Sequence, residues 1–279
     1  MLYKEFQPDI SLSHLIKCFW MFENEYPENH LERMIPDGYI DWVYHYGQKP
    51  ILIIDGKEIV KPSNFLGGHL ISSAQLKFSG ELKMFGIKFY PWASSFLYPM
   101  PAHELNNVRL EAEAIGGKWI KEYYSFMMDE LNIGNFLSVI QCLEKELKKM
   151  KFSETHSDKI LKKSFDFILN SKGDISIDDV SNMLGCSARH VQKIFHERRG
   201  MPFSFFCKLA RFQNVIHIAQ ANPSAKLIEV AYEGRYYDQS HFIKDFTQLT
   251  GLSPKKFFAE KHIYLSENTH SIITKPIGL

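Results

Sequence analysis

SARHVQKIFHERRG at residues 187–200 returns 51 residues later as DQSHFIKDFTQLTG at residues 238–251. Each copy opens on a residue whose side-chain oxygen can cap a helix N-terminus, Ser187 or Asp238. Apolar residues follow at positions i and i+4, which give a short helix one buried stripe. Each copy ends at a glycine with a proline shortly after it, so the helix cannot continue. The repeat therefore predicts two equivalent short helices.

A second short helix is predicted upstream of each copy, at residues 178–184 and 227–233. Helix, glycine-containing turn and capped second helix is the helix-turn-helix pattern, whose second helix enters the major groove of DNA. An apolar-striped helix around residues 205–216 joins the two units and would hold two reading helices about 34 Å apart along one face of a duplex. The alternative is a helical core whose repeat reflects duplication alone. Two units in register disfavour it.

Charge is distributed unevenly along the chain. Residues 1–150 hold 15 Lys and Arg against 19 Asp and Glu, whereas residues 151–279 hold 18 against 13. The repeat thus lies in the basic half, as expected of a module that binds a polyanion. The overall composition, with 45% hydrophobic and 23% charged residues, is that of a globular protein.

The first 90 residues are predicted to be β-rich. Residues 39–46 are dense in aromatic and β-branched side chains, and Asp55-Gly56 between two apolar runs predicts a hairpin. A second hairpin is predicted over residues 75–90 with its turn at Ser79-Gly80. From about residue 118 the apolar period changes to three or four, which predicts amphipathic helices broken at residues 132–134.

We therefore expect an α+β protein of two domains. Residues 1–152 would form a β-rich barrel-like or sandwich-like domain with trailing helices, serving effector sensing or dimerisation. Residues 158–262 would form an all-α DNA-binding domain with two helix-turn-helix units joined by a long helix, and residues 263–279 a loosely ordered tail.

Several function classes find no support in the sequence. The four cysteines are scattered without a C-x-x-C pair, and His69 and His103 lack partners at metal-ligand spacing, so neither a metal site nor a cofactor is expected. No nucleophile elbow, phosphate-binding glycine loop or H-E-x-x-H motif is present, which argues against an enzyme. The chain shows neither a membrane span nor a secretory signal, and with its scattered cysteines it is predicted to be cytoplasmic.

Residues 175–258 resemble the DNA-binding domain of the AraC/XylS family of transcription regulators. The most specific matches are Gly185-Cys186-Ser187-Ala188-Arg189-His190, Asp238-Gln239-Ser240-His241-Phe242 and Gly251-Leu252-Ser253-Pro254. The resemblance implies double-stranded DNA as partner. It also implies the outward-facing reading positions Ala188, Arg189, Gln192 and Lys193 in the first helix, and Gln239, Ser240, Ile243 and Lys244 in the second. Arg and Lys can bind guanine, Gln can pair with adenine, and Ile243 can offer only an apolar contact.

Other basic residues near the reading helices are assigned different roles. The position matching Arg211 in the family is structural, packing and hydrogen-bonding between the subdomains. His196, Arg198 and Arg199 follow the first reading helix, where phosphate contact and simple solvation are both open. The chain also departs from the family pattern twice. Arg235 occupies a turn position that usually holds glycine, with Gly234 one place early, and Val215 replaces an alanine of the connecting helix.

The N-terminal half resembles, more loosely, a sensor-like domain found before such modules. Met34-Ile35-Pro36-Asp37-Gly38 and Gly86-Ile87-Lys88-Phe89-Tyr90-Pro91 carry this resemblance. By residue type alone, the candidates for an effector site are Trp20, Arg33, Trp42, Tyr44, His69, Phe89 and Trp92, although aromatic residues of a small β domain are usually core.

The partners of the whole protein follow from this layout. A small-molecule effector, a homodimer, and RNA polymerase if the protein activates transcription are all implied by the resemblance. The helix containing Phe136 and Leu147 can serve as a dimer seam or pack on its own domain. A regulator without an effector, whose N-terminal domain only dimerises or binds a protein partner, remains the alternative.

Overall fold

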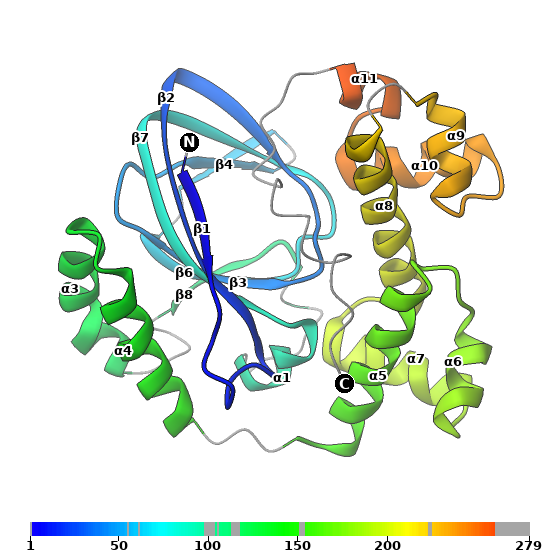
Figure 1. Ribbon diagram of the computed structural model, residues 1–279, viewed down its shortest axis with the longest axis horizontal. Coiled ribbons are helices and arrows are strands. Elements are labelled where there is room, and N and C mark those ends of the chain that lie inside the picture. Colours follow the sequence, from blue (N-terminus) through cyan, green and yellow to red (C-terminus); the bar gives the residue numbers. More distant parts are fainter. Residues whose placement is uncertain are drawn as a thin grey trace. The chain divides into compact units, whose positions relative to one another are not determined.

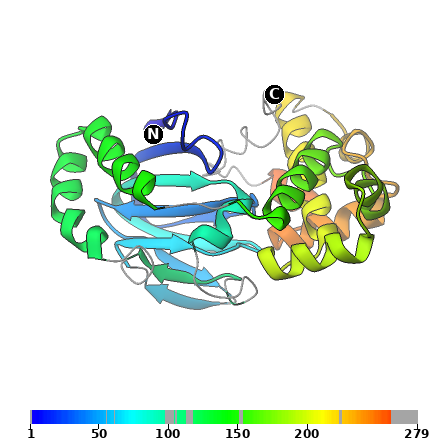
Figure 2. The ribbon, with the colours of Figure 1, turned by 90° about the horizontal axis from the view of Figure 1, so that it is seen from below.

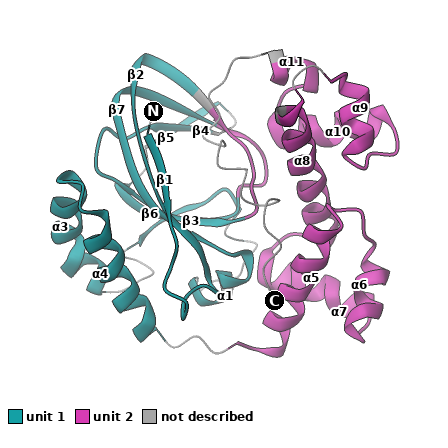
Figure 3. Ribbon diagram, in the orientation of Figure 1, with its two compact units in different colours: residues 1–31, 39–69, 75–153 teal, residues 32–38, 70–74, 154–279 magenta. Residues whose placement is uncertain are grey.

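The computed structural model describes residues 2–54, 56–60, 62–97, 104, 106–112, 118–150, 154–222 and 225–259. The chain forms two compact units that are interleaved in sequence (Figure 3). The first comprises Met1–Leu31, Tyr39–His69 and Gln75–Ser153; the second comprises Glu32–Gly38, Leu70–Ala74 and Glu154–Leu279.

An antiparallel sheet forms the first unit (Figure 1). Its strands are β1 (Leu2–Phe6), β2 (Ile16–Met34), β3 (Ile40–His45), β4 (Ile51–Ile54), β5 (Lys57–Val60), β6 (Asn64–Gly67), β7 (Ala74–Phe89) and β8 (Arg109–Glu111). The order β1-β2-β7-β3-β6-β8 has two free ends, and β4 pairs with β5 and β7 off this path. Within the described residues the sheet is therefore not closed into a barrel, which corrects the barrel-like form of the prediction.

One of the two predicted hairpins is confirmed. Strands β4 and β5 pair with Ile54 opposite Lys57, and Gly56 takes a φ of +75° at the turn. The predicted hairpin over residues 75–90 is wrong, because these residues lie in the single long strand β7. Gly80 does take a left-handed φ of +74°, but inside that strand, where a Cβ would meet the Gln48 side chain at 2.9 Å. The glycine serves a close approach and not a chain reversal.

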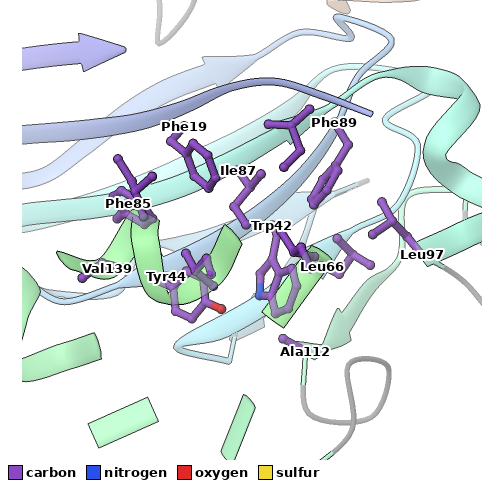
Figure 4. Close-up of a cluster of buried hydrophobic side chains, with 14 of the residues drawn as sticks. Phe19, Trp42, Tyr44, Leu66, Phe85, Ile87, Phe89, Leu97, Ala112 and Val139 are labelled. Carbon is purple, nitrogen blue, oxygen red and sulfur yellow. The ribbon is translucent and has the colours of Figure 1, made fainter. Parts of the chain in front are cut away.

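The helices that follow the sheet are α3 (Lys118–Asn132) and α4 (Phe136–Lys149), as the change of period predicts. They lie together on one side of the sheet (Figures 1 and 2). Val139, Ile140 and Leu143 of α4 share one buried cluster with Phe85 and Tyr44 of the sheet (Figure 4). The apolar stripe of α4 is thus used within its own domain, which decides between the two roles open to it. The short η1 (Pro91–Ala93) and α1 (Ser94–Leu97) follow β7 and are also buried.

Helices make up the C-terminal part of the second unit. They are α5 (His156–Asn170), α6 (Ile177–Leu184), α7 (Ala188–Arg199), α8 (Phe203–Ala221), α9 (Leu227–Glu233), α10 (Gln239–Thr250) and α11 (Pro254–Ala259). Figure 1 shows α8 running between the pair α6–α7 and the pair α9–α10. The predicted tail, residues 263–279, lies outside the described residues.

Candidate nucleic-acid interface

The first helix-turn-helix unit is formed by α6 and α7. Ser176 and Asp179 form a reciprocal capping box at the start of α6, and Gly185 ends it with a φ of +65°. The Ser187 hydroxyl accepts a hydrogen bond from the His190 amide at 3.2 Å and so begins α7. Gly200 ends α7 with a φ of +62°. The helix ends at Gly185 and Gly200 and the helix start at Ser187 are thus those that the sequence predicts.

The second unit, α9 and α10, has the same plan with a different turn. The Asp238 carboxylate accepts from the His241 amide at 2.7 Å and begins α10, and Gly251 ends it with a φ of +73°. In the turn, Gly234 has an ordinary φ of −72°, whereas Arg235 takes the left-handed value of +67°. The arginine itself therefore adopts the conformation that glycine would take without strain.

The two departures from the family pattern meet at Gly234. A Cβ at this position would lie 2.3 Å from Cγ2 of Val215 and 2.9 Å from the carbonyl oxygen of Val230. Glycine is therefore required at residue 234 by close packing and not by its φ. The bulkier Val215 on α8 uses the space that a side chain at residue 234 would need. The large side chain of Val215 and the missing side chain of Gly234 thus compensate for each other.

The residues implied in base reading lie on the outward faces of α7 and α10. Val191, Ile194 and Phe195 of α7 are buried, as are Phe242, Phe246 and Leu249 of α10. On the opposite faces Ala188 is half-buried, and the other reading positions are exposed: Arg189, Gln192, Lys193, Gln239, Ser240, Ile243 and Lys244. Among the exposed reading positions, Lys193 has its ammonium 3.7 Å from the carboxylate of Glu197. Each reading helix thus presents an accessible polar face.

Arg211, on α8, contacts residues near both helix-turn-helix units. Its guanidinium donates to the carbonyl oxygen of Gly173 at 2.8 Å, on the side of the first helix-turn-helix unit. It also lies 3.7 Å from the carboxylate of Asp245 on α10 and over the ring of Tyr236. The structural role implied for Arg211 is confirmed by these contacts.

Asp245 is a buried carboxylate surrounded by basic groups. Lys208 approaches it at 3.1 Å and His241 at 3.3 Å, in addition to Arg211. With 4% of its side chain exposed, Asp245 fixes α10 to α8 from the inner side of the reading helix.

The three basic residues at the end of α7 differ in their surroundings. His196 is exposed and stays a predicted phosphate contact. Arg198 lies 3.9 Å from Asp158, in the capping box of α5, and donates to Thr155 at 3.4 Å. Arg199 is fully buried, with its guanidinium 5.3 Å from the ring centroid of Phe206. Arg199 is therefore not a surface phosphate contact, and that part of the expectation is wrong.

The effector candidates do not gather at one place. Trp42, Tyr44 and Phe89 belong to the buried cluster of the first unit (Figure 4). The indole N–H of Trp20 donates to Asp41 and that of Trp92 to the carbonyl oxygen of His14. Arg33 belongs to the second unit, and His69 is buried outside the cluster. Of the effector-site candidates named from the sequence, the structure therefore places only Trp42, Tyr44 and Phe89 in one cluster.

Two polar residues that sequence reasoning missed border Trp42. The Trp42 indole N–H donates to Oδ1 of Asn64 at 2.6 Å, and Trp119 lies with its ring centroid 5.7 Å from that of Trp42. The Nδ2 of Asn64, the Nε1 of Trp119 and the Tyr44 hydroxyl are buried and have no hydrogen-bond partner of good geometry among the described residues, although the Asn64 side chain lies beside the Tyr44 hydroxyl. The strand register pairs Tyr44 with Asn64, and the packing of α3 on the sheet brings Trp119 to Trp42.

Among the described residues, no group of three or more His, Cys, Asp and Glu side chains is arranged to hold a metal ion. In the same part of the chain, no helix has the length and apolar character needed to cross a bilayer.

Comparison with known proteins gives two family matches. Residues 180–260 match the model described as a helix-turn-helix domain, and residues 4–111 match a domain of unknown function (DUF6597). The search of curated proteins gave no match.

Among solved structures, the chain is similar to ToxT from Vibrio cholerae, 13% identical with a TM-score of 0.47, over 86% of this chain and 98% of that chain. The C-terminal domain of AraT from Geobacillus stearothermophilus is 18% identical with a TM-score of 0.35, over 40% and 93% of the two chains. The matched helix-turn-helix model coincides with the two capped units described above. Residues 180–260 are therefore a helix-turn-helix domain.

Proposed function

We propose that the protein reads specific DNA sequences with both α7 and α10 and that a small-molecule effector bound in the N-terminal domain controls it. The observation that carries the first part is the pair of equivalent, capped helices with exposed polar faces, joined by α8. Ala188, Arg189, Gln192 and Lys193 would read one half-site, and Gln239, Ser240, Ile243 and Lys244 the other. The protein would act in the cytoplasm, as a homodimer where the operator is symmetric, and would contact RNA polymerase where it activates.

The reading positions are tested by the equivalent lysines of the repeat. Lys193→Ala and Lys244→Ala should each weaken binding to a duplex selected from a random library by the full-length protein. A phosphate contact would lower affinity for all sequences and reduce the salt slope by about 1, whereas a base contact would relax specificity at one position. Lys57→Ala, an exposed lysine of β5, removes the same charge and should bind as the wild type does. Unchanged affinity in both reading-helix variants would refute the assignment.

Support for an effector comes from the polar groups around Trp42. A buried polar group without a partner costs about 1–3 kcal/mol, so a ligand that supplies the missing partner gains that amount on binding. The unpartnered groups are hydrogen-bond donors, namely the Tyr44 hydroxyl, the Asn64 amide and the Trp119 indole. They are surrounded by aromatic rings. An apolar small molecule that carries an acceptor oxygen, such as a carbonyl or carboxylate, fits this chemistry.

A thermal-shift screen of small aromatic and aliphatic acids and ketones with the full-length protein tests the effector. A compound at 100 times its dissociation constant should stabilise the protein by about 2.7 kcal/mol. Tyr44→Phe should abolish that shift and change the stability of the ligand-free protein little, because the lost hydroxyl makes only a contact of poor geometry with Asn64. Trp92→Phe, whose indole lies outside the cluster, should keep the shift. A Tyr44→Phe variant that still responds fully would exclude this site, and a protein that dimerises without responding to any compound would favour the ligand-independent alternative.

A further inference from the structure

The Glu32–Gly38 segment belongs to the second unit although it lies between strands of the sheet in sequence (Figure 3). It contains the last three residues of β2 and the first residues of the connection to β3, which begins at Ile40. Its contacts within that unit reach both helix-turn-helix units and the helix between them. We call it the inserted segment.

Two contacts of the inserted segment lie at the ends of the reading helices. The guanidinium of Arg199, the last residue of α7, donates to the carbonyl oxygen of Gly38 at 3.2 Å. At the other end of the segment, Arg33 donates through Nη1 to the carbonyl oxygen of Thr250, the last residue of α10, at 3.0 Å. Residues 199 and 250 are equivalent positions of the 51-residue repeat. The segment thus holds the same point of both reading helices.

The middle of the inserted segment contacts α8 and the core of the second helix-turn-helix unit. Gln213, with 1% of its surface exposed, donates through Nε2 to the carbonyl oxygen of Pro36 at 3.0 Å. The side chain of Ile35 belongs to the buried cluster that contains Leu209 and Phe212. Gly38 has a φ of +82°, and a Cβ there would lie 3.0 Å from Leu209. The segment is therefore part of the packed interior and not a loop resting on a surface.

Breaking these contacts would cost free energy, because it would leave buried polar groups without hydrogen bonds. Arg199 carries a charge with no exposed surface, and a buried charge is tolerated only where hydrogen bonds and favourable dipoles compensate it. The carbonyl of Gly38 and the C-terminal end of α7 both supply such compensation. Arg33 likewise satisfies a carbonyl at the C-terminal end of α10, where helix carbonyls lack intrahelical partners.

We propose that the inserted segment is a positioning element that sets the spacing of α7 and α10, with Arg33, Arg199 and Gln213 as its positioning residues. Bound DNA requires the two helices at a fixed separation along the duplex. A segment attached to the last residue of each helix, and to the helix between them, restricts that separation. The inference rests on the proposed reading of DNA by both helices.

The same segment is continuous with β3, the strand that carries Trp42 and Tyr44. Trp42 follows Gly38 by four residues. A ligand that changes the conformation of β3 therefore acts on a chain segment that also holds both reading helices.

The test uses full-length Arg33→Met and Gln213→Leu, which remove one segment contact each. Their affinities are measured for a selected duplex with both half-sites, for duplexes with only one, and for duplexes with the half-sites shifted by one base pair. We expect roughly a tenfold loss, about 1.4 kcal/mol, on the two-site duplex. Affinity for one half-site should change less than about twofold, and the shifted duplexes should be discriminated less well than by the wild type. Lys57→Met serves as the charge-matched control.

Three outcomes decide the matter. Equal losses on one-site and two-site duplexes would mean that the contacts only stabilise the fold, and wild-type binding in both variants would mean that they do not position the helices; either overturns the inference and leaves DNA reading intact. A wild-type protein that gains nothing from the second half-site would overturn the proposed two-helix reading, and this inference with it. If Gln213→Leu fails to fold, the half-buried Arg33 still carries the test, since thermal unfolding separates its stability from its spacing effect.

Discussion

Gly234 illustrates how one residue is explained by a neighbour that is distant in sequence. Its φ of −72° is one that any residue adopts, so the usual reason for a glycine in a turn does not apply. The space for a side chain is filled instead by Val215 and by the carbonyl of Val230. The sequence showed both unusual residues but not that they touch.

Gly234→Ala should destabilise the protein by about 1–3 kcal/mol, because the added methyl overpacks a filled site. Val215→Ala in the same chain should restore part of the loss, and only part, because the Val230 carbonyl stays close. Urea denaturation of both single variants and the double variant gives the coupling, which should exceed about 0.5 kcal/mol. Gly185→Ala is the matched control. A Cβ at residue 185 meets nothing within 4 Å, so this variant is destabilised only by the left-handed φ of that residue. Additive effects of residues 215 and 234 would contradict the pairing.

Arg235 is a second residue whose conformation is costly. Holding arginine at a φ of +67° costs roughly 1 kcal/mol or more relative to glycine, and such strain often accompanies function. Its side chain is exposed in the turn that leads into α10. We expect it to contact a DNA phosphate.

Arg235→Gly should therefore move two quantities in opposite directions. The free energy of unfolding should hold or rise by up to about 1 kcal/mol, because relief of strain outweighs the entropy of glycine. DNA affinity should fall, with a salt slope lower by about 1. Denaturation and binding titrations at several salt concentrations measure both. Unaltered binding would show that Arg235 is merely tolerated in the turn.

At the scale of elements, α10 is fixed to α8 through the buried carboxylate of Asp245. Asp245→Asn removes the charge that Lys208, Arg211 and His241 surround. Breaking a buried ion pair by removing one partner typically costs about 3–5 kcal/mol, so the melting temperature should fall clearly. Asp238→Ala, which removes only an exposed helix cap, should cost about 1 kcal/mol. Equal stability of the two variants would show that the charge of Asp245 contributes no more to stability than one exposed helix cap does.

Elements with strong local signals were predictable from the sequence. In each of these signals the residues that interact are only a few positions apart in sequence. This holds for the caps and stop glycines of α7 and α10, for the Asp55-Gly56 turn and for the apolar stripe of α4. Ser79-Gly80 gave the same kind of local signal for a hairpin, yet β7 runs straight through it. There the approach of Gln48 to the glycine outweighs the turn preference.

Site features that depend on distant partners were not predictable. Arg199 is basic and follows a reading helix, which in sequence is typical of a phosphate contact. Its burial depends on Gly38, 161 residues earlier in the chain. The pairing of Tyr44 with Asn64 likewise follows from the strand register and not from either residue alone.

For the molecule as a whole, the four cysteines provide a probe in each unit. Burial raises the pKa of Cys18, in the first unit, and of Cys207, in the second, to about 12 each. Because the thiolate is the reactive form, neither should react with iodoacetamide at pH 8 until its unit unfolds. The half-buried Cys186 should react in the native protein, and the half-buried Cys142, whose pKa is raised by burial and by Glu146, should react more slowly.

Selected DNA should slow the alkylation of Cys186 alone, since this residue directly precedes the cap of α7. Cys142, on α4, is the internal control and should react at the same rate with and without DNA. Mass spectrometry of the labelled peptides follows all four sites in one sample. Equal protection of Cys142 would point to a global change on binding, and fast labelling of native Cys207 would contradict the described burial.

The interleaving of the two units bears on how such a protein can evolve. A gene fragment that began at the linker before α5 would carry both helix-turn-helix units but not the backbone carbonyls that Arg199 and Gln213 bind. Recombination onto a new sensor would therefore succeed only where that sensor brings its own equivalent of residues 32–38. We therefore expect the N-terminal domain and the helix-turn-helix units of such a chain to be inherited together, with exchange between relatives at whole-gene boundaries and not at the linker.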